Sequence, residues 1–130
     1  MKTYLDTSAL IKLVVVEPES PSLRSYLSTI PDDTLFTAAL TRTELIRAVR
    51  RVDAAAITRS RHLLGGLATV NLTNSLLDAA ALLEPPQLRS LDAIHLAAAQ
   101  RAGADLRAVI TYDTRMVDAA GLLAIPVIAP

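Results

Sequence analysis

The chain contains no cysteine and no tryptophan, and only four of its 130 residues are aromatic. Without cysteine, neither a disulfide bond nor a thiolate metal site can form, and the composition suits a reducing cytoplasm. With so few aromatic side chains, leucine, alanine, valine and isoleucine must fill the core.

Long apolar runs are also absent. No segment approaches the roughly 20 apolar residues that a membrane helix needs, and Asp6 and Lys12 interrupt the N-terminal stretch where a signal peptide would be apolar. We therefore expect a cytoplasmic protein with no membrane association. Negative and positive side chains number 13 each, so the total charge indicates no partner.

The composition is that of a folded protein. Apolar residues make up 52% of the chain and charged residues 20%, which argues against disorder. A length of 130 residues fits one domain, residues 1–130, with a substantial core.

Strand-like and helix-like segments alternate along the chain. We expect strands at 2–5, 34–38, 67–72, 106–112 and 125–129, and helices at 8–16, 20–30, 41–51, 54–64, 75–83, 91–102 and 114–120. Thr7 or Ser8 is expected to cap the first helix, Asp53 the fourth and Ser90 the sixth. The alternation predicts a three-layer α/β/α fold around a mostly parallel sheet of about five strands.

Two aspartates stand where an apolar strand gives way to a helix. Asp6 lies in "YLDTSALIKL" and Asp113 in "VITYDTRMVDAA". Parallel sheets bind ligands beyond the carboxyl ends of their strands. We therefore expect Asp6 and Asp113 side by side at this edge. Glu44 in "TRTELIRA" and Asp92 in "RSLDAIHLAAA" each fall in the first turn of a predicted helix.

Each of the four acids also has a purely local interpretation. Thr41-x-x-Glu44 matches a capping box, Asp92 suits a helix dipole, and Asp6 and Asp113 suit N-caps. Together, however, like charges at one edge would repel and raise one another's pKa values. A divalent cation such as Mg²⁺ or Mn²⁺, which prefers oxygen ligands, resolves that conflict.

Three polar side chains accompany the acids. The hydroxyls of Ser8 and Thr111 are expected to orient the carboxylates. His95 follows Asp92 by three residues, and we favour a partly buried helix residue with a satisfied hydrogen bond over a contact with substrate or protons. The order Ser8, His95, Asp113 could indicate a nucleophilic triad, but no G-x-S-x-G motif accompanies it.

The other acids show no comparable pattern. Asp33 lies in a predicted turn and Asp118 on the face of a predicted helix, although Asp118 is near enough to the predicted site to leave its role open.

The four quoted segments, read as "YLDTSALIKL", "TRTELIRA", "LRSLDAIHLAAA" and "VITYDTRM", resemble the four motifs of PIN-domain ribonucleases. More narrowly, they resemble the VapC toxins of toxin–antitoxin pairs. The resemblance covers essentially the whole chain in motif order and spacing. It implies a PIN-like fold.

The resemblance also implies an activity. The chain would be a metal-dependent endoribonuclease in which Asp6, Glu44, Asp92 and Asp113 bind one or two Mg²⁺ or Mn²⁺ ions. Hydrolysis by an activated water would leave 3′-hydroxyl and 5′-phosphate ends. The fourth acidic position varies in the family, so Asp113 is a less secure ligand than Asp6 or Asp92.

Partners follow from the same resemblance. It implies an RNA substrate, a small VapB-like antitoxin whose C-terminal segment wraps the toxin, a homodimer and a larger toxin–antitoxin complex.

Arginines are concentrated in one part of the chain. Six of the eleven fall between residues 42 and 61, against two acids. Arginine suits phosphate oxygens, so Arg47, Arg50 and Arg51 are candidate RNA contacts, as is Arg115 beside Asp113. A solvated helical hairpin is the alternative.

Three other functions compete with this prediction. A haloacid-dehalogenase-type enzyme needs D-x-D, but Ser8 occupies the second position. A phospho-receiver domain needs an aspartate after its third strand, and "TVNLTN" offers none. A non-catalytic PIN-fold module that binds RNA or protein remains the main alternative.

Overall fold

The computed structural model describes all 130 residues. Five strands form one sheet in the order β3-β2-β1-β4-β5, and every neighbouring pair is parallel. The strands are β1 (Lys2–Leu5), β2 (Thr34–Ala38), β3 (Ala68–Val70), β4 (Leu106–Ile110) and β5 (Val127–Ile128). The predicted α/β fold and its parallel sheet are confirmed.

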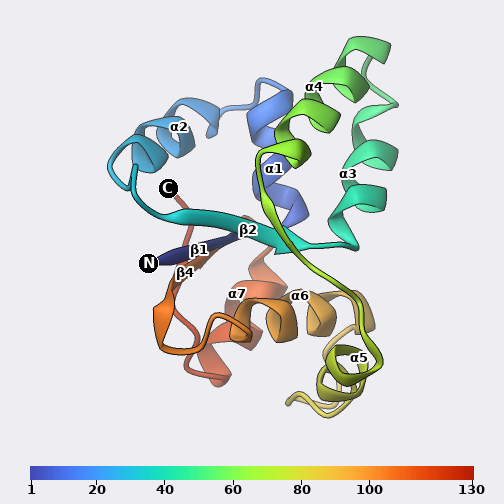
Figure 1. Cartoon of the computed structure of the whole chain (residues 1–130), viewed down its shortest axis with the longest axis vertical. Helices are drawn as coiled ribbons and strands as arrows, with labels where there is room; N and C mark the ends of the chain where they lie inside the picture. The colour runs from blue at the N-terminus through green and yellow to red at the C-terminus, as the bar shows by residue number, and fades with distance from the viewer.

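Seven α-helices connect the strands. They are α1 (Thr7–Val14), α2 (Ser20–Ser28), α3 (Thr41–Val49), α4 (Ala54–Gly65), α5 (Asn74–Ala81), α6 (Ser90–Gln100) and α7 (Thr114–Leu122), with a 3₁₀ turn η1 (Gly103–Asp105) before β4. Figure 1 shows α1 to α4 on one side of the sheet and α5 to α7 on the other. None of the helices is both long and apolar enough to cross a membrane.

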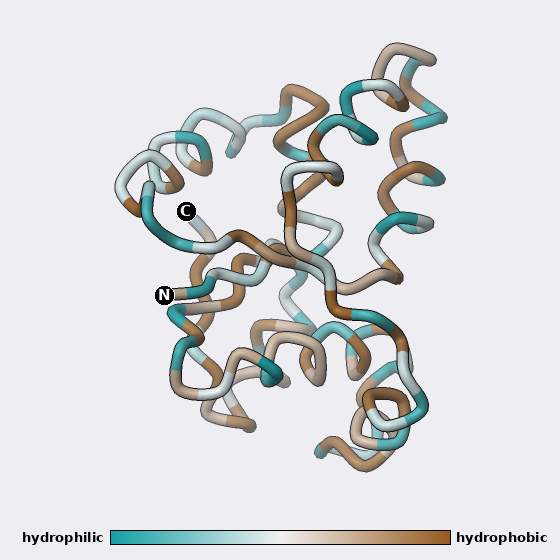
Figure 2. Tube along the Cα trace, viewed as in Figure 1, coloured by the Kyte–Doolittle hydropathy of each residue, from teal (hydrophilic) through white to brown (hydrophobic).

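The core is divided by the sheet. Side chains alternate along a strand, so Tyr4 and Val109 pack with α5, α6 and α7, whereas Leu5 and Ile110 pack with α1, α3 and α4. All four are fully buried. In Figure 2 hydrophobic and hydrophilic stretches alternate along the outer helices, as expected of helices with one buried face.

Several predicted helix starts differ from the observed ones. Asp6, rather than Thr7 or Ser8, caps α1, because both hydroxyls bond to carboxylates instead. Ser90 is the first residue of α6, and Arg89 before it makes no side-chain capping bond. Asp53 caps α4 as predicted, accepting a hydrogen bond from Ala56 N at 2.6 Å.

The amino end of the sheet is tied together by an ion pair that the sequence pattern did not indicate. Arg107 donates to Asp33 at 2.7 and 2.9 Å, and Thr3 Oγ1 donates to the same carboxylate at 2.7 Å. The Arg107 guanidinium holds the pKa of Asp33 well below its usual range. Asp33 is therefore a structural anchor rather than an ordinary turn residue.

Candidate active site

The carboxyl end of the sheet collects the predicted acids from different elements. Asp6 directly follows β1, Asp113 is the third residue after β4, and each is the N-cap of the next helix. Glu44 lies in the first turn of α3, and Asp92 in the first turn of α6. The N-cap roles of Asp6 and Asp113 are confirmed, and they fix both carboxylates at this edge.

Asp6 is the most buried of the four acids, with 2% of its surface exposed. Its Oδ1 accepts hydrogen bonds from Ser8 Oγ at 2.7 Å and Ala9 N at 3.0 Å, and its Oδ2 accepts one from Thr111 Oγ1 at 2.5 Å. Burial raises the pKa of Asp6 although these donors oppose the shift. The predicted placement of Ser8 and Thr111 beside a carboxylate is confirmed.

Glu44 is half-buried and bonded through one oxygen. Its Oε1 accepts from Thr7 Oγ1 at 2.7 Å and lies 2.6 Å from His95 Nε2. Burial opposes its charge, but the hydrogen bonds from His95 and Thr7 outweigh burial and lower the pKa of Glu44.

The capping-box interpretation of Glu44 is wrong. Leu40 occupies the N-cap of α3, and no side chain caps that helix. Thr41 is buried, and its hydroxyl lies 2.8 Å from that of Thr37 instead. Glu44 is therefore free of the local role that its sequence context offered.

Asp92 and Asp113 are electrostatically coupled. Burial and then the like charge of Asp113 raise the pKa of Asp92. Asp113 Oδ1 accepts from Arg115 N at 3.0 Å and lies 3.8 Å from the Arg115 Nε. Arg115 is exposed, so its guanidinium remains accessible beside the acids.

A hollow of about 290 Å³ opens next to Asp92. Arg115 and Asp118 line it together with Arg89, which the sequence reasoning missed. Arg89 stands three residues before Asp92, a spacing that puts both on one side of a helix start, and its charge favours ionised Asp92. The spacing in the sequence could therefore have predicted that Arg89 lies beside Asp92.

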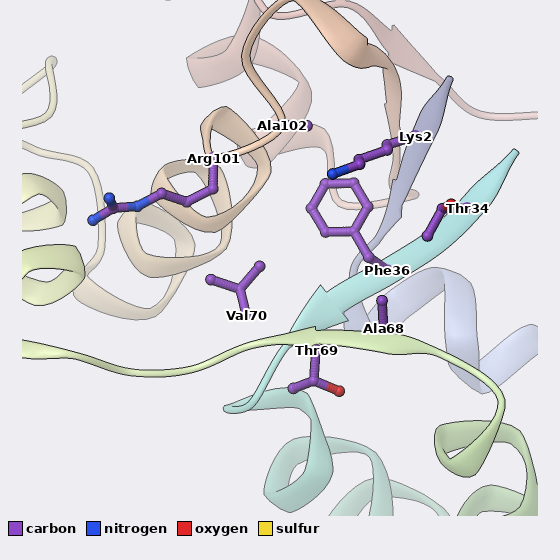
Figure 3. A pocket seen from close by; sticks show the side chains of 8 residues that line it. All are labelled: Lys2, Thr34, Phe36, Ala68, Thr69, Val70, Arg101 and Ala102. Carbon is purple, nitrogen blue, oxygen red and sulfur yellow. The ribbon is translucent and has the colours of Figure 1, made fainter.

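A second hollow lies elsewhere. The slot in Figure 3, of about 200 Å³, begins at Lys2 and Thr34 and passes Phe36 and Val70. Lys2 and Thr34 stand at the amino ends of β1 and β2. None of the predicted site residues lines this slot, so it is separate from the acids.

His95 is buried, with 3% of its surface exposed. Its Nδ1 lies 2.6 Å from the Tyr4 hydroxyl and its Nε2 lies 2.6 Å from Glu44 Oε1. The interpretation of His95 as a helix residue with satisfied hydrogen bonds is confirmed. The sequence analysis did not identify Tyr4, which bonds to His95, or Thr7, which bonds to Glu44. Thr7 directly follows Asp6, and this position could have predicted that Thr7 belongs to the candidate site.

The hairpin formed by α3 and α4, here called the arginine hairpin, extends away from the four acids. Arg47, Arg50 and Arg51 are exposed at the end of α3 and just after it. Figure 1 shows α3 and α4 rising away from the sheet. At 1.5 Å per residue, Arg51 lies about 10 Å along the helix direction from Glu44. Arg59, by contrast, donates to Val14 O and pairs with Asp53.

The chemistry of the acids suits a hard cation. All four offer oxygen ligands. The pKa values of Asp6 and Asp92 are raised, and a nearby positive charge would lower them by stabilising the ionised carboxylates. No group of three or more acidic or histidine side chains is yet arranged to hold a metal ion. The donor set fits such an ion, whereas the present side-chain positions do not form a completed coordination shell.

Comparison with known proteins identifies the family of this chain. The PIN domain family model matches residues 3–122. Ribonuclease VapC46 of Mycobacterium tuberculosis is 47% identical over 127 residues, which cover 98% of this chain and 96% of that protein. Ribonuclease VapC35 of the same species is 43% identical over 129 residues, with 98% and 96% coverage.

Solved structures have the same fold. A toxin–antitoxin complex from Klebsiella pneumoniae superposes with a TM-score of 0.73 at 25% identity, covering 99% of this chain and 98% of that one. VapC20 of M. tuberculosis, described as a sarcin-ricin loop cleaving toxin, gives 0.76 at 15% identity over 91% and 95% of the two chains. The chain belongs to the PIN-domain family and, within it, to the VapC toxins.

Proposed function

We propose that this chain is a metal-dependent endoribonuclease and the toxin of a toxin–antitoxin pair. One observation carries the proposal: Asp6 is almost fully buried, its pKa is raised, and all its hydrogen-bond donors are neutral. A buried carboxylate without a cationic partner is costly for folding alone. Similarity to the VapC ribonucleases supports the choice of RNA as substrate.

Asp6, Glu44, Asp92 and Asp113 would hold one or two Mg²⁺ or Mn²⁺ ions. When bound, such ions offset charge on the scissile phosphate and ease ionisation of the attacking water. Ser8 and Thr111 keep the Asp6 carboxylate in one orientation through their hydroxyls. The side chains would have to adjust when an ion binds, because no three of them are arranged to hold one.

The arginines would hold the RNA. Arg115 stands beside Asp113 with an accessible guanidinium and would bind a phosphate near the reacting bond. Arg47, Arg50 and Arg51 would contact the backbone further along the strand, which positions RNA without selecting its sequence.

Protein partners are part of the same proposal. Leu77 on α5, Leu91 on α6 and Leu122 on α7 are exposed apolar side chains on the layer opposite the arginine hairpin. A second copy of the chain, in a homodimer, would cover them. A small VapB-like antitoxin, and a larger complex containing both proteins, would restrain the activity. The similarity to a toxin–antitoxin complex supports this part.

The first experiment compares the wild-type protein with Asp6→Asn. Asparagine has nearly the same shape, and its carbonyl oxygen can still accept from Ser8 and Ala9, so we expect the variant to fold. Its cleavage of total RNA in Mg²⁺ or Mn²⁺ should fall at least about 100-fold. Sequencing of new 5′-phosphate ends and growth after induction measure cleavage and toxicity, and circular dichroism checks folding.

The outcome separates the two candidate functions. Cleavage or toxicity that persists at full strength in folded Asp6→Asn would overturn the assignment of Asp6. No Asp6-dependent ends with wild-type protein, combined with retained RNA binding, would favour a non-catalytic binding module. Loss of the new ends on co-expression with a small protein encoded beside the gene, where one is present, would identify that protein as the antitoxin.

A further inference from the structure

Glu44 is held by only one of its two carboxylate oxygens. Both of its donors, Thr7 Oγ1 and His95 Nε2, reach Oε1, and no hydrogen bond occupies Oε2. Asp6 differs, since its two oxygens are both bonded. Oε1 therefore fixes the Glu44 side chain while Oε2 stays available.

The direction of each hydrogen bond in this chain follows from a backbone amide. Ala38 N donates to the Tyr4 hydroxyl at 3.2 Å, so the Tyr4 oxygen acts there as an acceptor. The single phenol hydrogen is then free to point to His95 Nδ1, 2.6 Å away. With Nδ1 accepting, a neutral His95 carries its proton on Nε2 and donates it to Glu44.

Packing keeps this arrangement in place. Tyr4 is fully buried and His95 is 3% exposed. The Tyr4 ring meets Phe36 edge-on at 5.2 Å and His95 at 5.9 Å between centroids. Burial also raises the pKa of Tyr4, so the phenol keeps its proton and remains a donor. Both rings are therefore shielded from the water that could replace their hydrogen-bond partners.

We propose that His95, oriented by Tyr4, is a positioning residue that holds Glu44 by one oxygen and leaves the other for the reaction. The chain of bonds runs from the β2 backbone through β1 and α6 to α3. It thereby links the rigid centre of the sheet to a candidate ligand of the ion. The step from this geometry to catalysis rests on the proposed ribonuclease function.

The tautomer of His95 tests the geometry without any activity measurement. Long-range ¹⁵N–¹H spectra of the metal-free protein should show His95 protonated at Nε2, with Nδ1 as acceptor. The chain has only two histidines, and His62→Gln assigns the second. Tyr4→Phe removes the donor to Nδ1 and should shift the ¹⁵N resonance of Nδ1, whereas Nε2 stays protonated because Glu44 still accepts from it. A wild-type His95 protonated at Nδ1 alone would overturn the proposal.

Substitutions of His95 test its consequence. His95→Leu should raise the Mn²⁺ concentration needed for half-maximal cleavage by about 10- to 100-fold, with KM for RNA little changed. The same shift should appear in Mn²⁺ binding measured by electron paramagnetic resonance. His95→Gln places an amide donor near the Nε2 position and should restore most of the loss. Tyr26→Phe is the control, because this partly buried tyrosine of α2 packs against the core on the other side of the sheet.

The alternatives give different patterns. A purely structural His95 would make the Gln variant as impaired as the Leu variant, with losses that follow the melting temperature. Wild-type Mn²⁺ affinity and kcat in a folded His95→Leu would overturn the proposal. Asp6→Asn, measured in the same series, separates failure of the His95 proposal from failure of the proposed ribonuclease function. If Asp6→Asn cleaves RNA as well as the wild type does, only the proposed ribonuclease function is contradicted.

Discussion

Two aspartate side chains with almost no exposure show how residue chemistry separates structure from function. Asp33, at the amino end of the sheet, meets Arg107 and has a lowered pKa. Asp6, at the carboxyl end, meets only neutral donors and has a raised pKa. The first carboxylate is compensated within the chain. The second carboxylate has no cationic partner within the chain, as expected of a metal ligand.

These opposite shifts predict opposite effects on stability at low pH. The Asp33 contribution is complete above its unfolded pKa, near 4, and declines as the pH falls toward its lower folded pKa. Asp33→Asn should therefore lower the melting temperature at pH 7. The further decrease of the melting temperature on acidification should be smaller than in the wild type. For Asp6 the folded pKa is the higher one, so acidification relieves an unfavourable burial.

Asp6→Asn is the matched control for that experiment. This variant has no buried charge that acidification could neutralise. Its melting temperature should therefore fall more steeply with decreasing pH than that of the wild type. Melting temperatures between pH 7 and pH 2 measure both slopes. Equal slopes in the two variants would contradict the assigned environments.

At the scale of elements, the sequence predicted the order of strands and helices because the apolar periods are long and clear. It was weaker at their ends. Ser90 fits an N-cap by residue type, yet α6 begins on it. Glu44 fits a capping box three residues after Thr41, yet Thr41 is buried against Thr37. Local patterns could not reveal these competing contacts, because the partners lie on other elements.

The same limit applies to the candidate site. Asp6 and Asp113 were predictable because each directly follows a predicted strand, and parallel strands all end at the same edge of the sheet. The Tyr4–His95–Glu44 chain was not, since it joins residues 91 and 51 positions apart. A tyrosine within an apolar strand shows no sign in the sequence of where its hydroxyl will find a partner.

The hairpin of α3 and α4 carries a prediction about RNA. Replacing Arg47, Arg50 and Arg51 together with Gln should weaken RNA binding and reduce the slope of log K against log salt by about 2, at roughly 0.7 per phosphate contact on a single strand. The triple Lys variant retains the charge and should keep the slope. Binding titrations across salt concentrations measure it. An unchanged slope in the Gln variant would mean that this surface faces something other than RNA.

At the scale of the whole molecule, the candidate site joins the two helical layers. Asp6 and Glu44 belong to α1 and α3, on one side of the sheet, whereas Asp92 and Asp113 belong to α6 and α7, on the other. Glu44 already reaches across this boundary to His95 on α6. An ion shared by acids from both layers would therefore hold the layers together where the sheet ends.

That arrangement predicts that Mg²⁺ or Mn²⁺ stabilises the whole fold without RNA. A ligand that binds only the folded state adds about 2.7 kcal/mol at roughly 100 times its dissociation constant. The wild-type melting temperature should rise with either ion, whereas Asp6→Asn and Asp92→Asn should lose most of the rise. Asp78→Asn, at an exposed acid of α5, is the control and should respond as the wild type does. Potassium at equal ionic strength separates site binding from screening. A rise that persists in both site variants would place the ion elsewhere, and no rise at millimolar ion would mean that these acids do not form a cation site before RNA arrives.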